Sequence, residues 1–172
     1  AVWDAMPGLL AACLGTLWLA FGGMVLAIII GIGGVILRES RFMVVRGFVK
    51  AFVELIRNTP FLVQLFFFFF ALPAVGLRWS PYTAALVAMV INLGAYATEI
   101  IRAGIESIPK GQIEAGLALS LKPHQVFRLI ILKPALRTVY PALTSQFILL
   151  MLSSAVVSAI SADDLTSVAA NL

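Results

Sequence analysis

A few polar side chains stand inside the long apolar runs of this chain, and they are the residues best placed to do chemistry. Polar groups within an apolar helix are costly, so they usually face other helices or a water-filled cavity. They could therefore line a path for a polar solute, or they could make only hydrogen bonds between helices. The sequence leaves both interpretations open for these candidates: Glu54, Gln64, Asn92, Tyr96, Glu99, Ser153, Ser154 and Asp163.

Residues for metal binding or nucleophilic catalysis are sparse. His124 is the only histidine and belongs to no cluster of His, Cys and carboxylates, so no metal site is expected. Cys13, the only cysteine, lies in the first apolar run and is interpreted as a small apolar residue. An intramembrane enzyme would need a base beside Ser153 or Ser154, and the sequence identifies none.

The composition indicates a membrane protein. Of the 172 residues, 62% are hydrophobic and only 12% are charged. A helix needs about 20 apolar residues to cross a bilayer, and runs of that order without charge cover residues 5–37, 58–77, 79–98 and 138–162. Backbone polar groups must be paired within lipid, which requires helices or a closed β-barrel. The runs lack the period-two alternation that is typical of barrel strands. We therefore predict an all-α, polytopic helical membrane protein with four visible transmembrane spans.

The basic residues predict the orientation. Eleven of the twelve Lys and Arg residues fall within residues 38–57 and 102–137, and only Arg78 lies elsewhere. The positive-inside rule puts both stretches in the cytoplasm, so that both ends of the chain lie outside. Since these charges flank apolar runs and form no continuous stripe, the net charge of +4 does not indicate binding to nucleic acid.

Two features predict how the spans are shaped. Residues 38–57 alternate charged and apolar positions at spacings of three and four, which is typical of an amphipathic helix at the inner interface. Pro60 cannot donate to a helical ladder, so a kink or break is expected there. Small residues let helices approach closely in lipid, and the first run is rich in them: Gly15, Gly22, Gly23, Gly31, Gly33 and Gly34.

Two of the charged candidates have a simple structural alternative. Glu99 stands three residues before Arg102, and Glu54 stands three residues before Arg57. Each could form an ion pair on one helix face that anchors the helix at the inner surface. Asn92 lies two turns before Glu99, on the same face of the predicted helix.

The cytoplasmic loop, residues 107–134, contains a short apolar helix. Ser107 and Pro109 are plausible helix-start residues, and Lys122-Pro123 forces a stop. The helix between them, over residues 113–121, carries one charge and is too short to span a membrane. Its small residues allow close approach, so we predict a docking helix, either for a partner protein or for the inner surface of this chain.

The loop resembles the EAA loop of ABC importer permeases of the polar amino acid branch. That pattern is Glu-Ala-Ala, three residues, Gly, nine residues, then Ile-x-Leu-Pro. The matching residues here are Glu114, Ala115, Gly116, Ser120, Ile130, Leu132 and Pro134. The departures are Gly116 for the second Ala, Ser120 for Gly, and a Lys133 that shifts the proline by one position.

Further blocks are similar to the same branch, in the same order. They are residues 54–67, 94–112, 153–155 and 163–166, and with the loop they cover most of residues 10–168. Many members have a Lys just before the serine pair, where this chain has Leu152.

The resemblance implies a permease subunit of an ATP-driven amino acid importer in a bacterial inner membrane. It implies two cytoplasmic ATP-binding subunits, a second permease subunit that is identical or related, an extracytoplasmic solute-binding protein and a small polar amino acid as solute. ATP and Mg²⁺ would bind the partner ATPase, since this chain has no Gly-x4-Gly-Lys-Ser/Thr loop. The ATPase-docking residues are expected to be Gln112, Glu114, Ala115, Gly116, Leu117, Ser120 and Leu121.

Family members have a five-helix core, so we expect residues 1–172 to be a single permease domain that continues beyond Leu172 with a further span. The chain begins at Ala1 without Met, so a trimmed N-terminus is also expected. The coupling loop would occupy about residues 103–133. The alternatives are a permease for another small polar solute, such as an opine, and a channel-like or intramembrane enzyme subunit.

Overall fold

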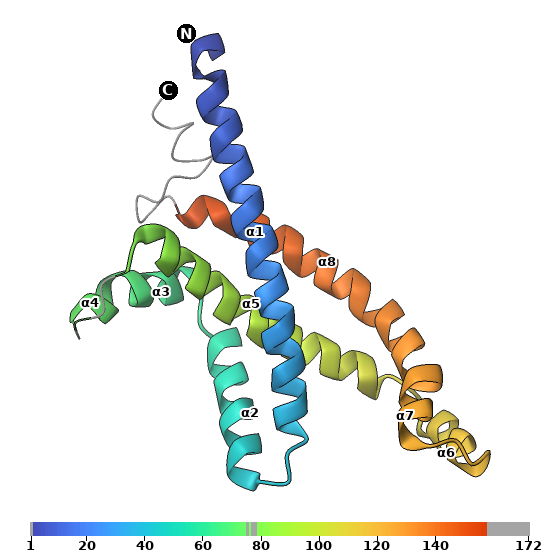
Figure 1. The fold of residues 1–172 in the computed structure, drawn as a ribbon. Helices are drawn as coiled ribbons and strands as arrows, with labels where there is room; N and C mark the ends of the chain where they lie inside the picture. Colours follow the sequence, from blue (N-terminus) through green and yellow to red (C-terminus); the bar gives the residue numbers. More distant parts are fainter. Residues whose placement is uncertain (1, 75, 77–78, 158–172) are drawn as a thin grey trace.

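The computed structural model describes residues 2–74, 76 and 79–157, and this part of the chain is helical without strands (Figure 1). The all-α membrane fold predicted from the sequence is confirmed. In chain order the elements are α1 (Val2–Arg38), α2 (Met43–Arg57), α3 (Phe61–Phe66), the π-helical turn η1 (Phe67–Ala71), α4 (Leu72–Ala74), α5 (Pro81–Glu106), α6 (Lys110–Ala118), α7 (Pro123–Val126), the π-helical turn η2 (Phe127–Ile131) and α8 (Leu132–Val157).

Two helices in the described part are long and apolar enough to cross a membrane: the Ala20–Arg38 part of α1, and α5. A third span is formed if α2 and the Phe61–Ala74 segment count as one broken helix. The fourth predicted span, residues 138–162, begins within α8 and continues past the described residues. That the chain contains four spans therefore stays a prediction.

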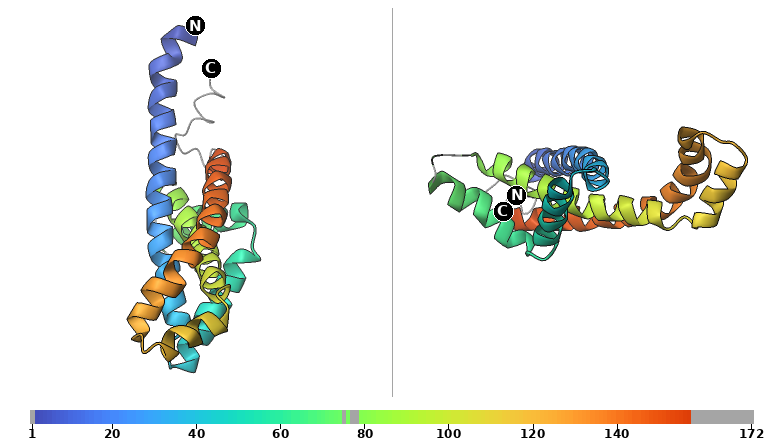
Figure 2. Two further views of the ribbon diagram at one scale, coloured as in Figure 1. Left: turned by 90° about the vertical axis from the view of Figure 1, so that its right-hand side faces the viewer. Right: turned by 90° about the horizontal axis from the view of Figure 1, so that it is seen from below.

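Small residues bring α1 and α5 together, in the most extensive helix contact of the described part (Figure 2). A Cβ atom added at Gly31 would lie 2.7 Å from the Cβ of Ala97 and 3.1 Å from the backbone nitrogen of Thr98. On α5, a Cβ added at Gly94 would lie 2.8 Å from Cγ2 of Ile30 in α1. The close glycine packing predicted for the first run is confirmed at Gly31 and Gly34, whereas a Cβ at Gly15, Gly22 or Gly33 would meet no described atom within 4 Å.

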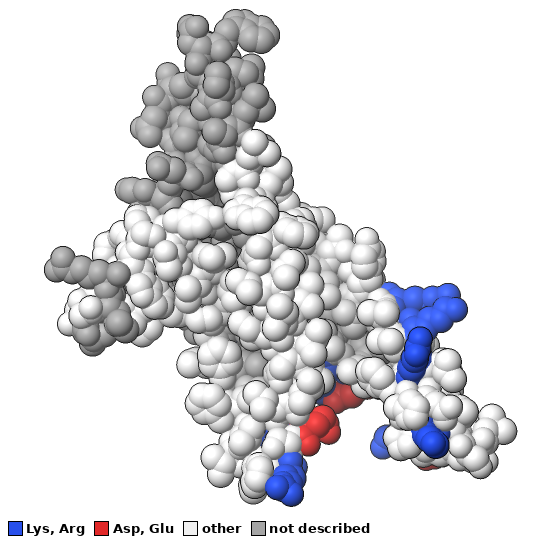
Figure 3. Space-filling model, viewed as in Figure 1, with Lys and Arg blue, Asp and Glu red and all other residues white. Residues whose placement is uncertain are grey.

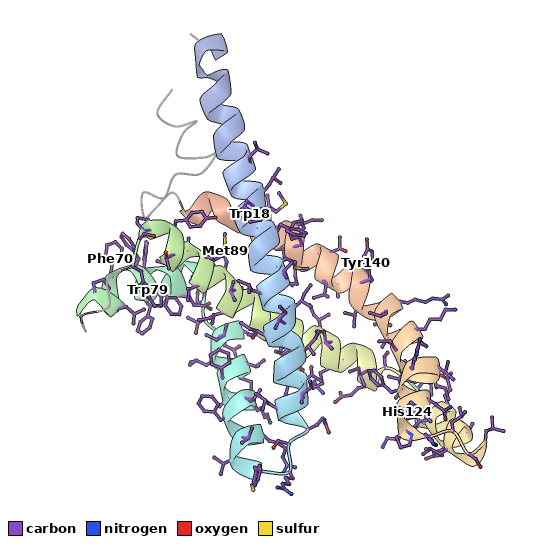
Figure 4. All side chains as sticks on the ribbon, in the orientation of Figure 1. Trp18, Phe70, Trp79, Met89, His124 and Tyr140 are labelled. Carbon is purple, nitrogen blue, oxygen red and sulfur yellow. The ribbon has the colours of Figure 1, made fainter. Side chains whose placement is uncertain are left out.

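The start of α5 packs against α3 and η1 around a buried apolar cluster. Leu65, Met89 and Leu93 are at most 2% exposed at its centre. Trp79 stacks on Phe68 with 6.0 Å between ring centroids, and Figure 4 shows Trp79 and Met89 at this end of α5. This cluster holds the segment after the helix break against α5.

Prolines explain the irregular turns. The break expected at Pro60 is confirmed, because α2 ends at Arg57, α3 begins at Phe61, and the helical path bends by 107° between them. A proline also crowds the carbonyl four residues earlier. Pro73 and Pro134 each follow a π-helical turn by two or three residues, and in both cases the crowded carbonyl lies within that turn. Pro134, the proline shifted by one position from the family pattern, does not interrupt the helix: α7, η2 and α8 follow one another without a gap.

The loop helix lies earlier in the chain than predicted. We expected it over residues 113–121, but α6 covers Lys110–Ala118, and Pro109 precedes it as expected. It ends before Lys122 because Ser120 adopts a left-handed backbone with φ 60°. This conformation commonly terminates helices and is usually adopted by glycine, which is the family residue at this position.

Candidate functional site

The break between α2 and α3 exposes the backbone carbonyls of the last turn of α2. A helix end leaves its last four carbonyls without intrahelical partners, and within lipid these must be paired. Here residues of the break itself provide two partners. The Nδ2 of Asn58 donates to the carbonyl of Glu54 at 2.8 Å, and the Oγ1 of Thr59 donates to that of Leu55 at 2.7 Å.

Side chains from α3 and α5 provide the other two partners. The Nε2 of Gln64 donates to the carbonyls of Ile56 at 2.8 Å and Thr59 at 2.9 Å. The hydroxyl of Tyr96 donates to the carbonyl of Arg57 at 3.5 Å. Each of the last four carbonyls of α2 therefore accepts a side-chain hydrogen bond.

Gln64 serves the backbone of the break. It is only 5% exposed, and both protons of its amide nitrogen are donated to backbone carbonyls. Its Oε1 accepts from the Nδ2 of Asn92 at 3.2 Å. Among the two interpretations left open for the polar candidates, hydrogen bonding between segments describes Gln64.

A polar cavity of about 460 Å³ opens beside the break, between α5 and α8. Its size lies within the range of small-molecule sites, about 300–1,000 Å³. Phe61 and Leu149 contribute apolar surface. The polar lining residues are Arg57, Asn58, Thr59, Asn92, Tyr96 and Gln146.

Of the predicted solute-path residues whose side chains are described, two line this cavity, Asn92 and Tyr96. Arg57, Asn58 and Thr59 were not among our candidates, although they lie within the block of residues 54–67 that carries the family resemblance. Gln146 was missed as well. Its signal is a polar amide within the last apolar run, residues 138–162.

Arg57 and Glu54 do not form the ion pair considered from their spacing. The guanidinium of Arg57 lies over the ring of Tyr96, 5.4 Å from its centroid. Glu54 instead faces Lys50, with 3.9 Å between Oε1 and Nζ, and it does not line the cavity. Both groups of that pair are largely exposed, so its contribution to stability is small.

Glu99 belongs to a charge network at the inner end of α5. Its Oε2 lies 2.5 Å from Nη1 of Arg38, which ends α1, and its Oε1 pairs with Arg102. Arg102 also pairs with Glu106. The predicted pair of Glu99 and Arg102 is confirmed, while the role of Arg38 was missed because the sequence does not show which helix ends meet. Glu99 does not line the polar cavity.

The remaining predicted path residues lie outside what the structure describes. The backbone of Ser153 and Ser154 lies in α8, but the structure does not describe their side chains. Asp163 lies in residues 158–172, which are not described.

A second cavity, of about 530 Å³, lies between α1, α5 and α8 and is apolar. Isoleucine, leucine and valine side chains line most of it, and Glu39 is its single charged lining residue. Such a lining offers few hydrogen-bond partners to a polar solute, so the smaller cavity is the better candidate.

Of the two interpretations left open for the loop helix, the structure shows packing of α6 on this chain, and docking on a partner stays a prediction. Gly116 is buried against the chain itself, since a Cβ there would collide with Cδ1 of Ile130 and lie 3.4 Å from Cγ2 of Val126. Glu114, Ala115, Leu117 and Ser120 are exposed, as is Gln112, while Leu121 is partly buried. One face of α6 therefore packs on α7 and η2, and the other face is exposed.

Charged residues in view gather at the end of the molecule where α2, α6 and the start of α8 lie (Figure 3). The opposite half of that face is uncharged where it is described. His124 lies with the loop helices at the charged end (Figure 4). This distribution agrees with the cytoplasmic placement predicted for both basic stretches.

The sequence matches a family model described as binding-protein-dependent transport system inner membrane component, over residues 23–171. It is 40% identical over 151 residues to the glutamine transport system permease protein GlnP of Escherichia coli (strain K12), covering 87% of this chain and 69% of that protein. It is 39% identical over 138 residues to the L-cystine transport system permease protein TcyB of Bacillus subtilis (strain 168), covering 80% and 57%.

A solved structure has a similar fold and sequence. It is described as the crystal structure of an amino acid ABC transporter with histidines, and the two superpose with a TM-score of 0.89 at 32% identity. The match covers 96% of this chain and 78% of that one.

Proposed function

This chain belongs to the family of inner membrane components of binding-protein-dependent transport systems, and we propose that it forms the solute path of an ATP-driven amino acid importer. Components of this family work with an ATPase and a solute-binding protein. In the proposal, this chain pairs with a second permease subunit, identical or related, and two ATPase subunits bind ATP and Mg²⁺ in the cytoplasm.

The observation that carries the proposal is the polar cavity beside the broken helix. Irregular backbone within a membrane is tolerated only where it is buried in protein or lines a water-filled cavity. The break here lines such a cavity, and side chains cap the carbonyls at the end of α2. A broken helix that lines a polar cavity is a common form of solute site in transporters.

Coupling to the ATPase follows from how α6 is attached. Only three residues, 107–109, separate α5 from α6, so a displacement of α6 acts directly on the helix that carries Asn92 and Tyr96. Gly104 of α5 also packs tightly on Val139 of α8. We therefore propose that the exposed face of α6 docks on the ATPase and that α5 transmits its movement to the cavity.

An amino acid is the solute favoured by the relatives. GlnP and TcyB are named for glutamine and cystine, which differ in size and shape but share the α-amino acid group. If the solute is instead another small polar molecule, such as an opine, an uptake assay with the solute-binding protein of the same system would detect its transport.

The docking proposal is tested by Ala115→Arg. The exposed methyl group of Ala115 is replaced by a long charged chain, which should block close docking and abolish solute-stimulated ATP hydrolysis and uptake in proteoliposomes. Ala115→Ser keeps a small side chain at the same position and should behave as the wild type.

Wild-type stimulation of the ATPase in Ala115→Arg would contradict docking at this face. Uptake by vesicles that contain this chain without ATPase subunits would indicate a channel instead of an importer. No ATP-dependent uptake of any amino acid by the complete wild-type complex would contradict the importer proposal itself.

A further inference from the structure

The polar cavity contains one cationic group and no anionic one among its described lining residues. The cation is Arg57, at the end of α2, where the helix breaks. The other polar lining residues, including Asn92, Gln146 and Tyr96, are uncharged at neutral pH. A ligand that enters this cavity therefore meets a localised positive charge and several neutral hydrogen-bonding groups.

Arg57 is held in place but its charge is not neutralised. Its guanidinium lies over the ring of Tyr96, and its carbonyl accepts from the hydroxyl of the same tyrosine. Its nearest acid in sequence, Glu54, faces Lys50 instead. Within the described residues, no carboxylate lies within ion-pair distance of Arg57. The guanidinium remains free to form paired hydrogen bonds with a planar anion.

The hydrogen bonds at the break fix which way the side-chain amide of Asn92 is oriented. Because Gln64 uses its amide nitrogen for two backbone carbonyls, Asn92 must donate its own nitrogen to Oε1 of Gln64. The Oδ1 of Asn92 is then left as an acceptor at the cavity, and no described residue donates to it. An acceptor beside a cationic donor is complementary to a zwitterion, in which an ammonium group stands next to a carboxylate.

We propose that this cavity binds the head group of an amino acid, with the α-carboxylate on Arg57 and the α-ammonium on the amide oxygen of Asn92. The proposal rests on the importer function given above. It also selects the solute class, because the described lining residues offer no carboxylate to a basic side chain and no second cation to an acidic one. The solute is a neutral amino acid, whose side chain lies against Gln146, Phe61 and Leu149.

The test compares Arg57→Gln and Arg57→Lys with a matched arginine outside the cavity. Arg41 also lies over an aromatic ring, 4.9 Å from the centroid of Phe42, so Arg41→Gln removes a similar contact and the same charge. Each variant is assembled with its ATPase and solute-binding protein in proteoliposomes. Initial uptake is measured for a panel of radiolabelled neutral, acidic and basic L-amino acids. Equilibrium binding of the transported amino acid to the permease–ATPase complex alone shows whether a loss arises in this chain.

The wild type should take up a neutral amino acid in preference to acidic and basic ones. Arg57→Gln should lower uptake and binding about 10- to 100-fold, because a charge-assisted hydrogen-bond pair is lost. Arg57→Lys should show a smaller loss, and Arg41→Gln should match the wild type.

Unchanged uptake and binding in Arg57→Gln would overturn the carboxylate site while leaving the importer function intact. Preferred uptake of an acidic or basic amino acid by the wild type would overturn the neutral solute class. If both Arg57 variants fail to assemble with the ATPase while Arg41→Gln assembles, the residue is structural and the proposal is wrong. Absence of any uptake by the wild type contradicts the proposed function instead.

Discussion

The side chain of Gln64 stabilises the helix break between α2 and α3. Unpaired carbonyls in lipid each cost several kcal/mol, roughly as much as a small domain can lose before unfolding. Gln64 reaches back from α3 to the last turn of α2 and pairs two carbonyls at once. Its burial and its hydrogen bond from Asn92 then connect the break to α5.

We predict that Gln64→Leu destabilises the protein although leucine is similar in size and more apolar. The substitution leaves the carbonyls of Ile56 and Thr59 without the amide donor, which costs about 1–3 kcal/mol. Unfolding of the purified protein in detergent measures the change. Gln112→Leu, at an exposed position of α6, is the control and should shift stability by less than about 0.5 kcal/mol. Equal stability of the two variants would contradict the capping role.

Residue types alone identified polar groups within apolar helices, but they did not separate the roles of those groups. Asn92 and Tyr96 were predicted and lie at the cavity, whereas Glu99 pairs with Arg38 from another helix. The distinction depends on which helix faces which, and one sequence does not contain that information. Arg57 was missed because its spacing from Glu54 suggested an ion pair, which the structure does not contain.

At the scale of elements, backbone chemistry was the most predictable part. Pro60 predicted the break because a missing amide proton acts locally, whereas the π-helical turns before Pro73 and Pro134 were not predicted, and Pro141 lies inside α8 without such a turn. The end of α6 was predicted too late, because the stop was assigned to Lys122-Pro123. The left-handed Ser120, at a position where the family has glycine, was the stronger signal.

Close packing of α1 on α5 involves several glycines, and at Gly31 the neighbours are the Cβ of Ala97 and backbone atoms of Ala97 and Thr98. We predict that Gly31→Ala destabilises the helix pair by about 1–3 kcal/mol, because its Cβ would press on the backbone of Ala97 and Thr98. Gly33→Ala is a matched control on the same helix, since a Cβ there meets no atom within 4 Å. It should be neutral or slightly stabilising, because alanine favours a helix. Thermal unfolding of both variants in one detergent checks the difference, and equal shifts would contradict close packing at Gly31.

Across the whole molecule, the charged end and the polar cavity lie in different regions, and α5 connects them. Its outer half packs on α3 and η1, its middle carries Asn92 and Tyr96, and its inner end holds the network of Glu99 with Arg38 and Arg102. Residues 107–109 then lead to α6. A rigid helix that contacts both the cavity and the docking loop is suited to couple them.

The orientation of the molecule is open to a direct labelling test. The charged end should face the cytoplasm, because basic residues resist transfer across the membrane during insertion. Starting from Cys13→Ala, we predict that Met43→Cys, 79% exposed at the start of α2, reacts with a membrane-impermeant maleimide only in permeabilised cells. Ser80→Cys, which is exposed just before α5, should react in intact spheroplasts as well. The parent without cysteine controls for background labelling. Labelling of Met43→Cys in intact spheroplasts would reverse the orientation, and it would place α6 on the side of the membrane that contains no ATPase.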